Sequence, residues 1–234
     1  YGTTGATHEV GTASNMKVLI HSNVEDDASD NQHPLVVTGP TQITASPARA
    51  NWGGSTWDFN GTNGNYMYLP KSTDWDLLAG ADWTLECWAR LDTADLDYKR
   101  VVSTPDKGAY AGWALHLNNS DQMQFGHDSG TIILSGTSAS AVTVNTWHHW
   151  AVTYTHSNTT SKLYRDGTEV LSTTSAINWT KSNTNLLIGA RSVSGGSGAL
   201  DEIGATPEYV WPGQIEDLRI PRGLCVYSGN FTAP

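Results

Sequence analysis

The sequence predicts an all-β fold, in which two antiparallel sheets pack face to face as a sandwich. Two observations lead to this prediction. Apolar and polar residues alternate with a period of two through most of the chain, whereas helical periodicity is nearly absent. The composition is rich in Thr, aromatic residues, Gly and Asn, which favour strands and the turns between them. The length of 234 residues suits a single large sandwich, because such domains often exceed 200 residues.

The first half of the chain contains the clearest single strand. Residues 83–91 (WTLECWARL) alternate so that Trp83, Leu85, Cys87, Ala89 and Leu91 share one face, and Thr84, Glu86, Trp88 and Arg90 share the other. Shorter strands are expected before and after it, at residues 16–21, 53–60, 66–70, 101–103, 112–117 and 122–125. Turn residues such as those of 60–64 separate these strands.

The second half continues this pattern. Strands are expected at residues 131–134, 147–155, 186–190 and 213–220. Residues 162–171 (KLYRDGTEVL) form a predicted hairpin, since the Asp166–Gly167 pair suits a type I′ turn with positive φ at both positions. About a dozen short strands with turns between them indicate a sandwich or barrel. Residues 191–209 are expected to form a long, acidic loop, and long loops are often functional.

Charge and hydropathy exclude several classes of partner. The formal net charge is −10, from 13 Lys and Arg against 23 Asp and Glu, and no basic cluster occurs. Nucleic acid is therefore not an expected partner, because phosphate binding needs such a cluster. No apolar run reaches the 18 or so residues of a membrane-spanning helix, so membrane insertion is not expected either. The low charged fraction of 15% is typical of extracellular and virion proteins.

The strand blocks, read in order, resemble those of a known family. The blocks VLIH, WTLECWARL, NTWHHWAVTY, KLYRDGTEV and GQIEDLRI follow the order found in laminin-G-like jelly-roll domains of the concanavalin A-like lectin/glucanase superfamily. The resemblance implies that residues 16–234 form one jelly-roll domain. Residues 1–15 would then lie outside it, as a flexible N-terminal arm that orders on a partner.

The C-terminal residues resemble a segment of bacteriophage versions of this domain. In that segment a Tyr is followed by Phe-Thr-x-Pro, and here these residues are Tyr227, Phe231, Thr232 and Pro234. The resemblance implies a virion protein. The two cysteines, Cys87 and Cys225, form neither a disulfide framework nor a zinc pattern, although a single bridge between them stays open.

Catalysis is not expected. Glycoside hydrolases of the superfamily need two carboxylates at a fixed separation across the sugar. Their alternating Glu-x-Asp-x-Glu strand does not occur in this sequence. Glu216 and Asp217 are adjacent, and so should point to opposite faces of a strand. His148 and His149 also alternate within a strand, and a structural role is expected for them.

Calcium is a possible structural cofactor, because many laminin-G-like domains hold one ion. Its ligands would be carboxylate and carbonyl oxygens. The expected ligands are Asp26, Asp27 and Asp30 in the acidic turn, with Glu216 and Asp217 on the last strand, which should lie beside the first. The alternative is that the turn is simply solvated.

A carbohydrate site would need exposed aromatic rings. Trp83, Trp147 and Trp150 are expected to pack between the sheets, as are most of the 10 Trp. The expected glycan- or partner-binding residues lie in predicted loops and are Tyr209, Trp211, Trp179, Trp52 and Tyr110. The alternative is that these rings fold back onto the sandwich.

Two functional hypotheses follow. The first is a non-catalytic structural protein of the virion surface (a decoration, fibre or tail-associated protein) that assembles with other virion proteins or with copies of itself, and adheres to cell-surface polysaccharide. The second is a lectin-like, carbohydrate-binding module of a secreted cellular protein. Both place the protein on a virion surface or in the extracellular space.

Overall fold

In the residues that it describes, the computed structural model of the chain has fifteen strands in two antiparallel sheets. It describes residues 14–21, 26–40, 42–44, 55–77, 80–94, 97–105, 112–126, 132–134, 140–177, 183–191 and 207–234. The only helical element among these residues is the 3-10 turn η1 (His156–Asn158). No helix in the described ranges is long and apolar enough to cross a membrane. The prediction of an all-β sandwich is confirmed.

Sheet A has eight strands. Their order is β13 (Thr168–Thr174), β12 (Thr160–Arg165), β11 (Trp147–Thr155), β6 (Trp83–Leu91), β15 (Gly213–Pro221), β4 (Thr56–Asp58) and β3 (Gln42–Thr44), and β1 (Met16–Ile20) also pairs with β15. The first strand therefore lies beside the last, as predicted.

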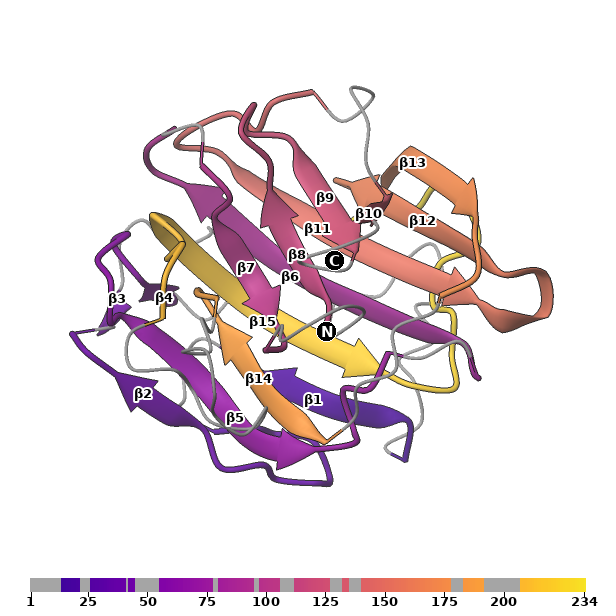
Figure 1. Cartoon of the computed structure of the whole chain (residues 1–234), viewed down its shortest axis with the longest axis horizontal. Coiled ribbons are helices and arrows are strands. Elements are labelled where there is room, and N and C mark those ends of the chain that lie inside the picture. The colour runs from indigo at the N-terminus through magenta and orange to yellow at the C-terminus, as the bar shows by residue number, and fades with distance from the viewer. Residues whose placement is uncertain are drawn as a thin grey trace, which may run out of the picture.

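Sheet B has seven strands. Their order is β10 (Ile132–Leu134), β9 (Met123–Gly126), β8 (Ala114–Leu117), β7 (Arg100–Ser103), β14 (Thr184–Ile188), β5 (Tyr66–Ser72) and β2 (Val36–Thr38). In Figure 1, β7, β8, β9 and β14 of sheet B cross in front of β6, β11 and β15 of sheet A. The two strands missing from the sequence prediction, β2 and β3, have only three residues each, too few to show a period of two.

The hydrophobic core fills the space between the sheets. Trp83 and Trp150 are buried there, as predicted. The Trp83 ring stacks on Tyr154 of the neighbouring strand at 5.6 Å between ring centroids, and lies 5.5 Å from Phe125 of sheet B, so it links the two layers. The predicted alternation of β6 is confirmed, since Trp83, Leu85, Cys87, Ala89 and Leu91 all join the core.

Both cysteines are free thiols, so the bridge that the sequence left open does not form. Cys87 lies in the core, and burial raises the pKa of its thiol. The predicted hairpin turn is also confirmed, because Asp166 and Gly167 both have positive φ, of 52° and 79°. Of the predicted N-terminal arm, only Ser14 and Asn15 lie within the described residues, and the Asn15 carbonyl accepts a hydrogen bond from the Arg222 backbone at 2.9 Å.

Candidate functional site

Tyr209 lies where the predicted acidic loop returns to the sandwich. Its ring is half-buried, with the guanidinium carbons of Arg100 and Arg191 at 5.6 and 5.4 Å from the ring centroid. Its backbone carbonyl accepts a hydrogen bond from the Arg100 N–H at 3.0 Å. The preceding Glu208 exchanges two backbone hydrogen bonds with Arg191. Tyr209 is therefore a fixed, partly exposed ring, as a binding residue requires.

The structure contradicts the expectation for Trp211. Its side chain is fully buried in the core, and its indole N–H donates to the Arg90 carbonyl at 3.1 Å. A buried ring offers no face to a ligand, so Trp211 is a structural residue. The three other predicted aromatic residues, Trp52, Tyr110 and Trp179, lie outside the described residues, as do residues 192–206 of the loop.

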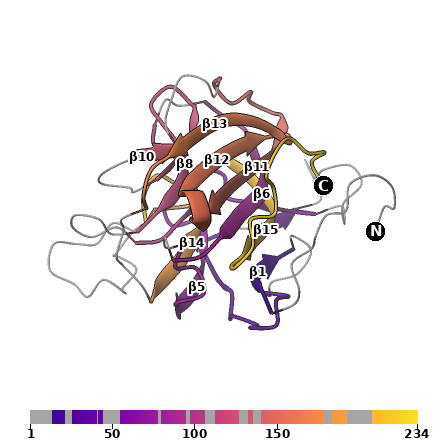
Figure 2. The same cartoon turned by 90° about the vertical axis from the view of Figure 1, so that its right-hand side faces the viewer.

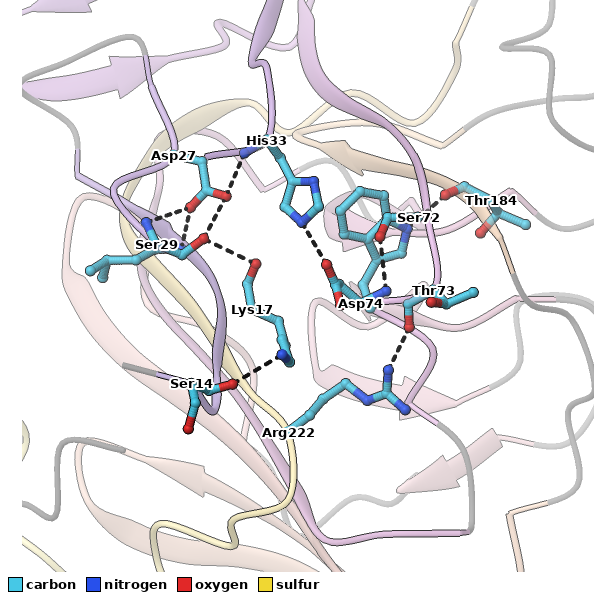
Figure 3. A network of polar contacts seen from close by, with 12 residues as sticks. Ser14, Lys17, Asp27, Ser29, His33, Ser72, Thr73, Asp74, Thr184 and Arg222 are labelled. Atoms are coloured by element: carbon cyan, nitrogen blue, oxygen red, sulfur yellow. Dashed lines mark hydrogen bonds and ion pairs between the residues drawn. The ribbon is translucent and has the colours of Figure 1, made fainter. Parts of the chain in front are cut away.

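The predicted calcium ligands do not converge. Asp27 is buried, and its two carboxylate oxygens already accept hydrogen bonds from the backbone N–H groups of Leu19, Ser29 and His33 and from the Ser29 hydroxyl, at 2.8 to 3.1 Å. Figure 3 shows this carboxylate surrounded by donors. Asp26 and Asp30 are exposed beside it. Asp27 is thus used to fold the acidic turn against β1.

The two acidic residues of β15 lie near Trp88 and His21. Glu216 is buried and pairs in register with Trp88 on the outer side of sheet A. Asp217 has a φ of 49°, where the strand is bulged, and its carboxylate lies 3.0 Å from His21 Nδ1. In the described ranges, no three or more Asp, Glu, His or Cys side chains come together as a metal site. The residues described do not fit the calcium site that the resemblance implied.

The outer face of sheet A carries a strip of aromatic and polar side chains that the sequence analysis missed. In register, Trp147 of β11 faces Arg90 of β6, which faces Gln214 of β15. The adjacent row of the sheet places Trp88 beside Arg90 along β6. We call Trp88, Arg90, Trp147 and Gln214 the outer-face strip. Trp88 and Trp147 are half-buried, whereas Gln214 is buried.

Hydrogen bonds fix the polar part of the strip. Arg90 donates to the Gln214 side-chain carbonyl and to Asn145 Oδ1, both at 2.7 Å, and also to Asp92. Gln214 in turn donates its amide N–H to Asp92 at 2.8 Å. The Arg90 side chain is 13% exposed and the Asp92 side chain 35%. This network holds planar polar groups in place beside two indole rings.

A second polar group lies next to the strip on the same face. Glu86 is buried on β6, two residues before Trp88. Its carboxylate lies 3.0 Å from His149 Nε2 and 3.0 Å from Arg219, and accepts a hydrogen bond from the Tyr227 hydroxyl at 2.7 Å. Burial alone would raise the pKa of Glu86, but the His149 hydrogen bond, the Arg219 charge and the Tyr227 hydrogen bond outweigh it and lower the pKa to about 2.

The C-terminal segment (residues 223–234) covers Glu86. Tyr227 and Phe231 stack with ring centroids 3.5 Å apart, and pack on Tyr164 and Ala151 of sheet A as a small cluster separate from the core. In Figure 2 the segment, in yellow, runs beside β6, β11 and β15. The sequence singled out this segment for its resemblance, but its contact with β6 spans 141 residues, and no local pattern reveals such a contact.

Trp147 was predicted wrongly, as a core residue. It lies on the face opposite Trp150, since an odd and an even position alternate on a strand. Trp150 is fully buried between the sheets, whereas Trp147 is half-buried on the outside. Strict use of the alternation would have placed Trp147 and His149 together on the outer face. Trp88 lies on that face as well, because it pairs in register with His149.

Comparison with known proteins agrees with this architecture. The family model described as concanavalin A-like lectin/glucanases superfamily matches residues 60–222. No curated protein matches the chain significantly. Among solved structures, domain 4 of AbnA, an extracellular GH43 arabinanase from Geobacillus stearothermophilus solved with arabinotriose, is 16% identical, with a TM-score of 0.62 over 90% of this chain and 94% of that domain.

Toxin binding domains are also similar. The binding domain of botulinum neurotoxin serotype C1 is 12% identical, with a TM-score of 0.61 over 90% of this chain and 49% of the toxin chain. The binding domain of Paraclostridial Mosquitocidal Protein 1 is 15% identical, with a TM-score of 0.56 over 90% and 48%. The chain thus spans about half the length of these toxin chains. At such identities, the similarity establishes the fold alone.

Proposed function

Since the chain belongs to the concanavalin A-like lectin/glucanases superfamily, we propose that it is a non-catalytic, lectin-like module that binds carbohydrate on the outer-face strip. The observation that carries the proposal is the pair of half-buried residues, Trp88 and Trp147, beside Arg90, which the buried Gln214 holds by a hydrogen bond. An indole ring packs against the apolar face of a sugar, and planar polar groups bind its hydroxyls.

The geometry of the strip favours binding without large rearrangement. Arg90 is held by three side-chain acceptors, so its guanidinium is oriented before a ligand arrives. Such preorganisation lowers the entropy cost of binding. The same contacts argue against hydrolysis, because Asp92 already accepts hydrogen bonds from Arg90 and Gln214, and a glycosidase needs two carboxylates flanking the bond that breaks.

The experiment is a binding screen with arabinotriose, arabinan and ganglioside oligosaccharides. Arabinotriose is the ligand in the structure of the similar arabinanase domain. Gangliosides are chosen because the cell entry of botulinum neurotoxin type C, which is also similar, is dependent on two ganglioside molecules. Trp147→Ala and Trp88→Ala should each weaken binding about tenfold, the effect of losing one stacked ring. Tyr98→Ala is the matched control, since Tyr98 is an exposed aromatic residue, 43% exposed, that is not part of the outer-face strip.

Two results would change the proposal. If Tyr209→Ala abolishes binding while the two Trp variants bind normally, the site is the Tyr209 ring that the sequence predicted. If the wild-type protein releases reducing ends from a glycan it binds, the module is catalytic, and Asp92→Asn then becomes the variant to examine.

We further propose that the module works on the exterior of a bacteriophage particle, in contact with other virion proteins or with copies of itself. Support comes from the phage-like pattern Tyr227…Phe231-Thr232-x-Pro234, whose two rings stack on sheet A, so the pattern marks a packed structural element. Mass spectrometry of purified particles should find the protein in a fixed copy number. Recovery from culture medium without particles would instead support a secreted cellular module.

A further inference from the structure

The C-terminal segment lies next to the outer-face strip in the direction of the strands. Along β6, Glu86 and Trp88 are two residues apart on the same face, which corresponds to about 7 Å. Tyr227 binds Glu86, and so the segment crosses sheet A directly beside Trp88. The strip is therefore bounded on one side by this segment.

The His149 side chain connects the segment to the strip. His149 of β11 pairs in register with Trp88, and their rings lie 5.3 Å apart. On its other side, His149 meets Phe231 at 5.7 Å and Tyr227 at 6.4 Å, in both cases edge to face. His149 is buried and is held between the ligand-facing ring and the C-terminal segment.

Glu86 fixes this arrangement. One carboxylate oxygen lies 3.0 Å from His149 Nε2 and also accepts the Tyr227 hydroxyl, so the same atom holds both the strand residue and the segment. The other oxygen lies 3.0 Å from Arg219 of β15. If a neutral His149 donates through Nε2, Nδ1 is the acceptor nitrogen, and among the described residues this buried atom has no hydrogen-bond partner.

The segment is anchored as a fixed wall and not as a movable lid. Its backbone donates from Val226 to the Thr84 hydroxyl and from Phe231 to the Gly167 carbonyl, both at 2.9 Å. Its Asn230 side chain accepts from the Glu169 N–H, also at 2.9 Å. A Cβ on Gly167 would lie 1.9 Å from the Phe231 carbonyl oxygen, so the hairpin turn and the segment are fitted to each other.

We infer that the C-terminal segment is a wall of the carbohydrate site and that Glu86 is the positioning residue that couples this wall, through His149, to Trp88. The inference rests on the proposed function for its ligand. It extends that function by assigning a binding role to residues that touch no sugar. An extended saccharide on the strip would contact Trp147 on β11 and Trp88 and Arg90 on β6.

The test compares two hydroxyl deletions in the same cluster. Tyr227→Phe removes the donor to Glu86, whereas Tyr164→Phe removes a hydroxyl that donates to the Tyr227 carbonyl at 3.4 Å and does not reach Glu86. Against arabinotriose and the ganglioside oligosaccharides, Tyr227→Phe should weaken binding about fivefold, and Tyr164→Phe by less than about twofold. Glu86→Gln should match Tyr227→Phe or exceed it.

A second readout does not depend on any ligand. In nitrogen-15 NMR spectra of the full chain, the Trp88 indole N–H resonance and the His149 ring tautomer should change in Tyr227→Phe and in Glu86→Gln, and should stay at their wild-type positions in Tyr164→Phe. A glutamine can donate as well as accept, so it permits the other tautomer of His149.

The outcomes separate the two proposals. Suppose that Trp88→Ala abolishes glycan binding while Tyr227→Phe and Glu86→Gln have the same glycan affinity and the same Trp88 and His149 resonances as Tyr164→Phe. That result overturns the role of the C-terminal segment as a wall and leaves the proposed function standing. If no glycan binds while the Trp88 resonance moves as expected, the coupling stands and the proposed ligand is overturned.

Discussion

The two faces of sheet A are made by the same strands but have different chemistry. The inner face, with Trp83, Leu85 and Trp150, is apolar and fully buried. The outer face places Glu86, Trp88 and His149 at the alternating positions, in a network of ion pairs and rings. On the inside, volume and hydrophobicity determine which residue fits. On the outside, hydrogen-bond geometry does, and this is the face on which we propose that a ligand binds.

The most direct way to break this comparison is to truncate one Trp on each face of the same strand. Trp150→Ala should destabilise the protein by about 3–5 kcal/mol, because it opens a cavity in the core. Trp147→Ala should cost less than about 1 kcal/mol, since its ring is half-exposed on the outer face. Urea denaturation of the two variants measures both values. Equal losses of unfolding free energy would mean that Trp147 is a core residue after all.

Lowering the pH should reduce the free energy of unfolding through the outer face of sheet A, because the ionisable Glu86 lies there and the inner face is apolar. The native pKa of Glu86 is lowered from 4.5 to about 2, so its ionised form is favoured by folding. The resulting stability, roughly 3 kcal/mol, is fully present above pH 4.5 and is lost as the pH falls through about 2. His149, Arg219 and Tyr227 are the charged or titratable partners of this carboxyl.

Urea denaturation between pH 2 and 6 tests this contribution. Glu86→Gln should be less stable than the wild type at pH 6, and the difference should shrink towards pH 2, where the wild-type carboxyl becomes protonated. A difference that stays constant over this range would show that Glu86 ionisation does not stabilise the fold.

The long strands could be predicted because each one carries its own alternation. Residues 83–91 show the pattern completely, and the Asp166–Gly167 turn follows from the conformational freedom of those two residues. The outer-face strip could be predicted only in part. Alternation assigns Trp147 and Trp88 to one face, but their proximity depends on the register between β11 and β6. The wall formed by Tyr227 and Phe231 could not be predicted, because it depends on how the chain returns to β6 after 141 residues.

The smallest expected effect is that of a substitution in the acidic turn. It tests whether the Asp27 carboxylate accepts hydrogen bonds from the protein or binds calcium. Asp27→Asn keeps the size of the side chain but replaces one acceptor oxygen with a donor, which cannot accept from the N–H groups and the hydroxyl that Asp27 now serves. We expect a loss of about 1–2 kcal/mol in unfolding free energy. The loss should be the same in EDTA and in millimolar calcium, because the carboxylate is engaged by protein donors. If calcium raises the melting temperature of the wild type and not that of Asp27→Asn, the turn binds the ion, and the hydrogen bonds to Asp27 are those of the calcium-free form.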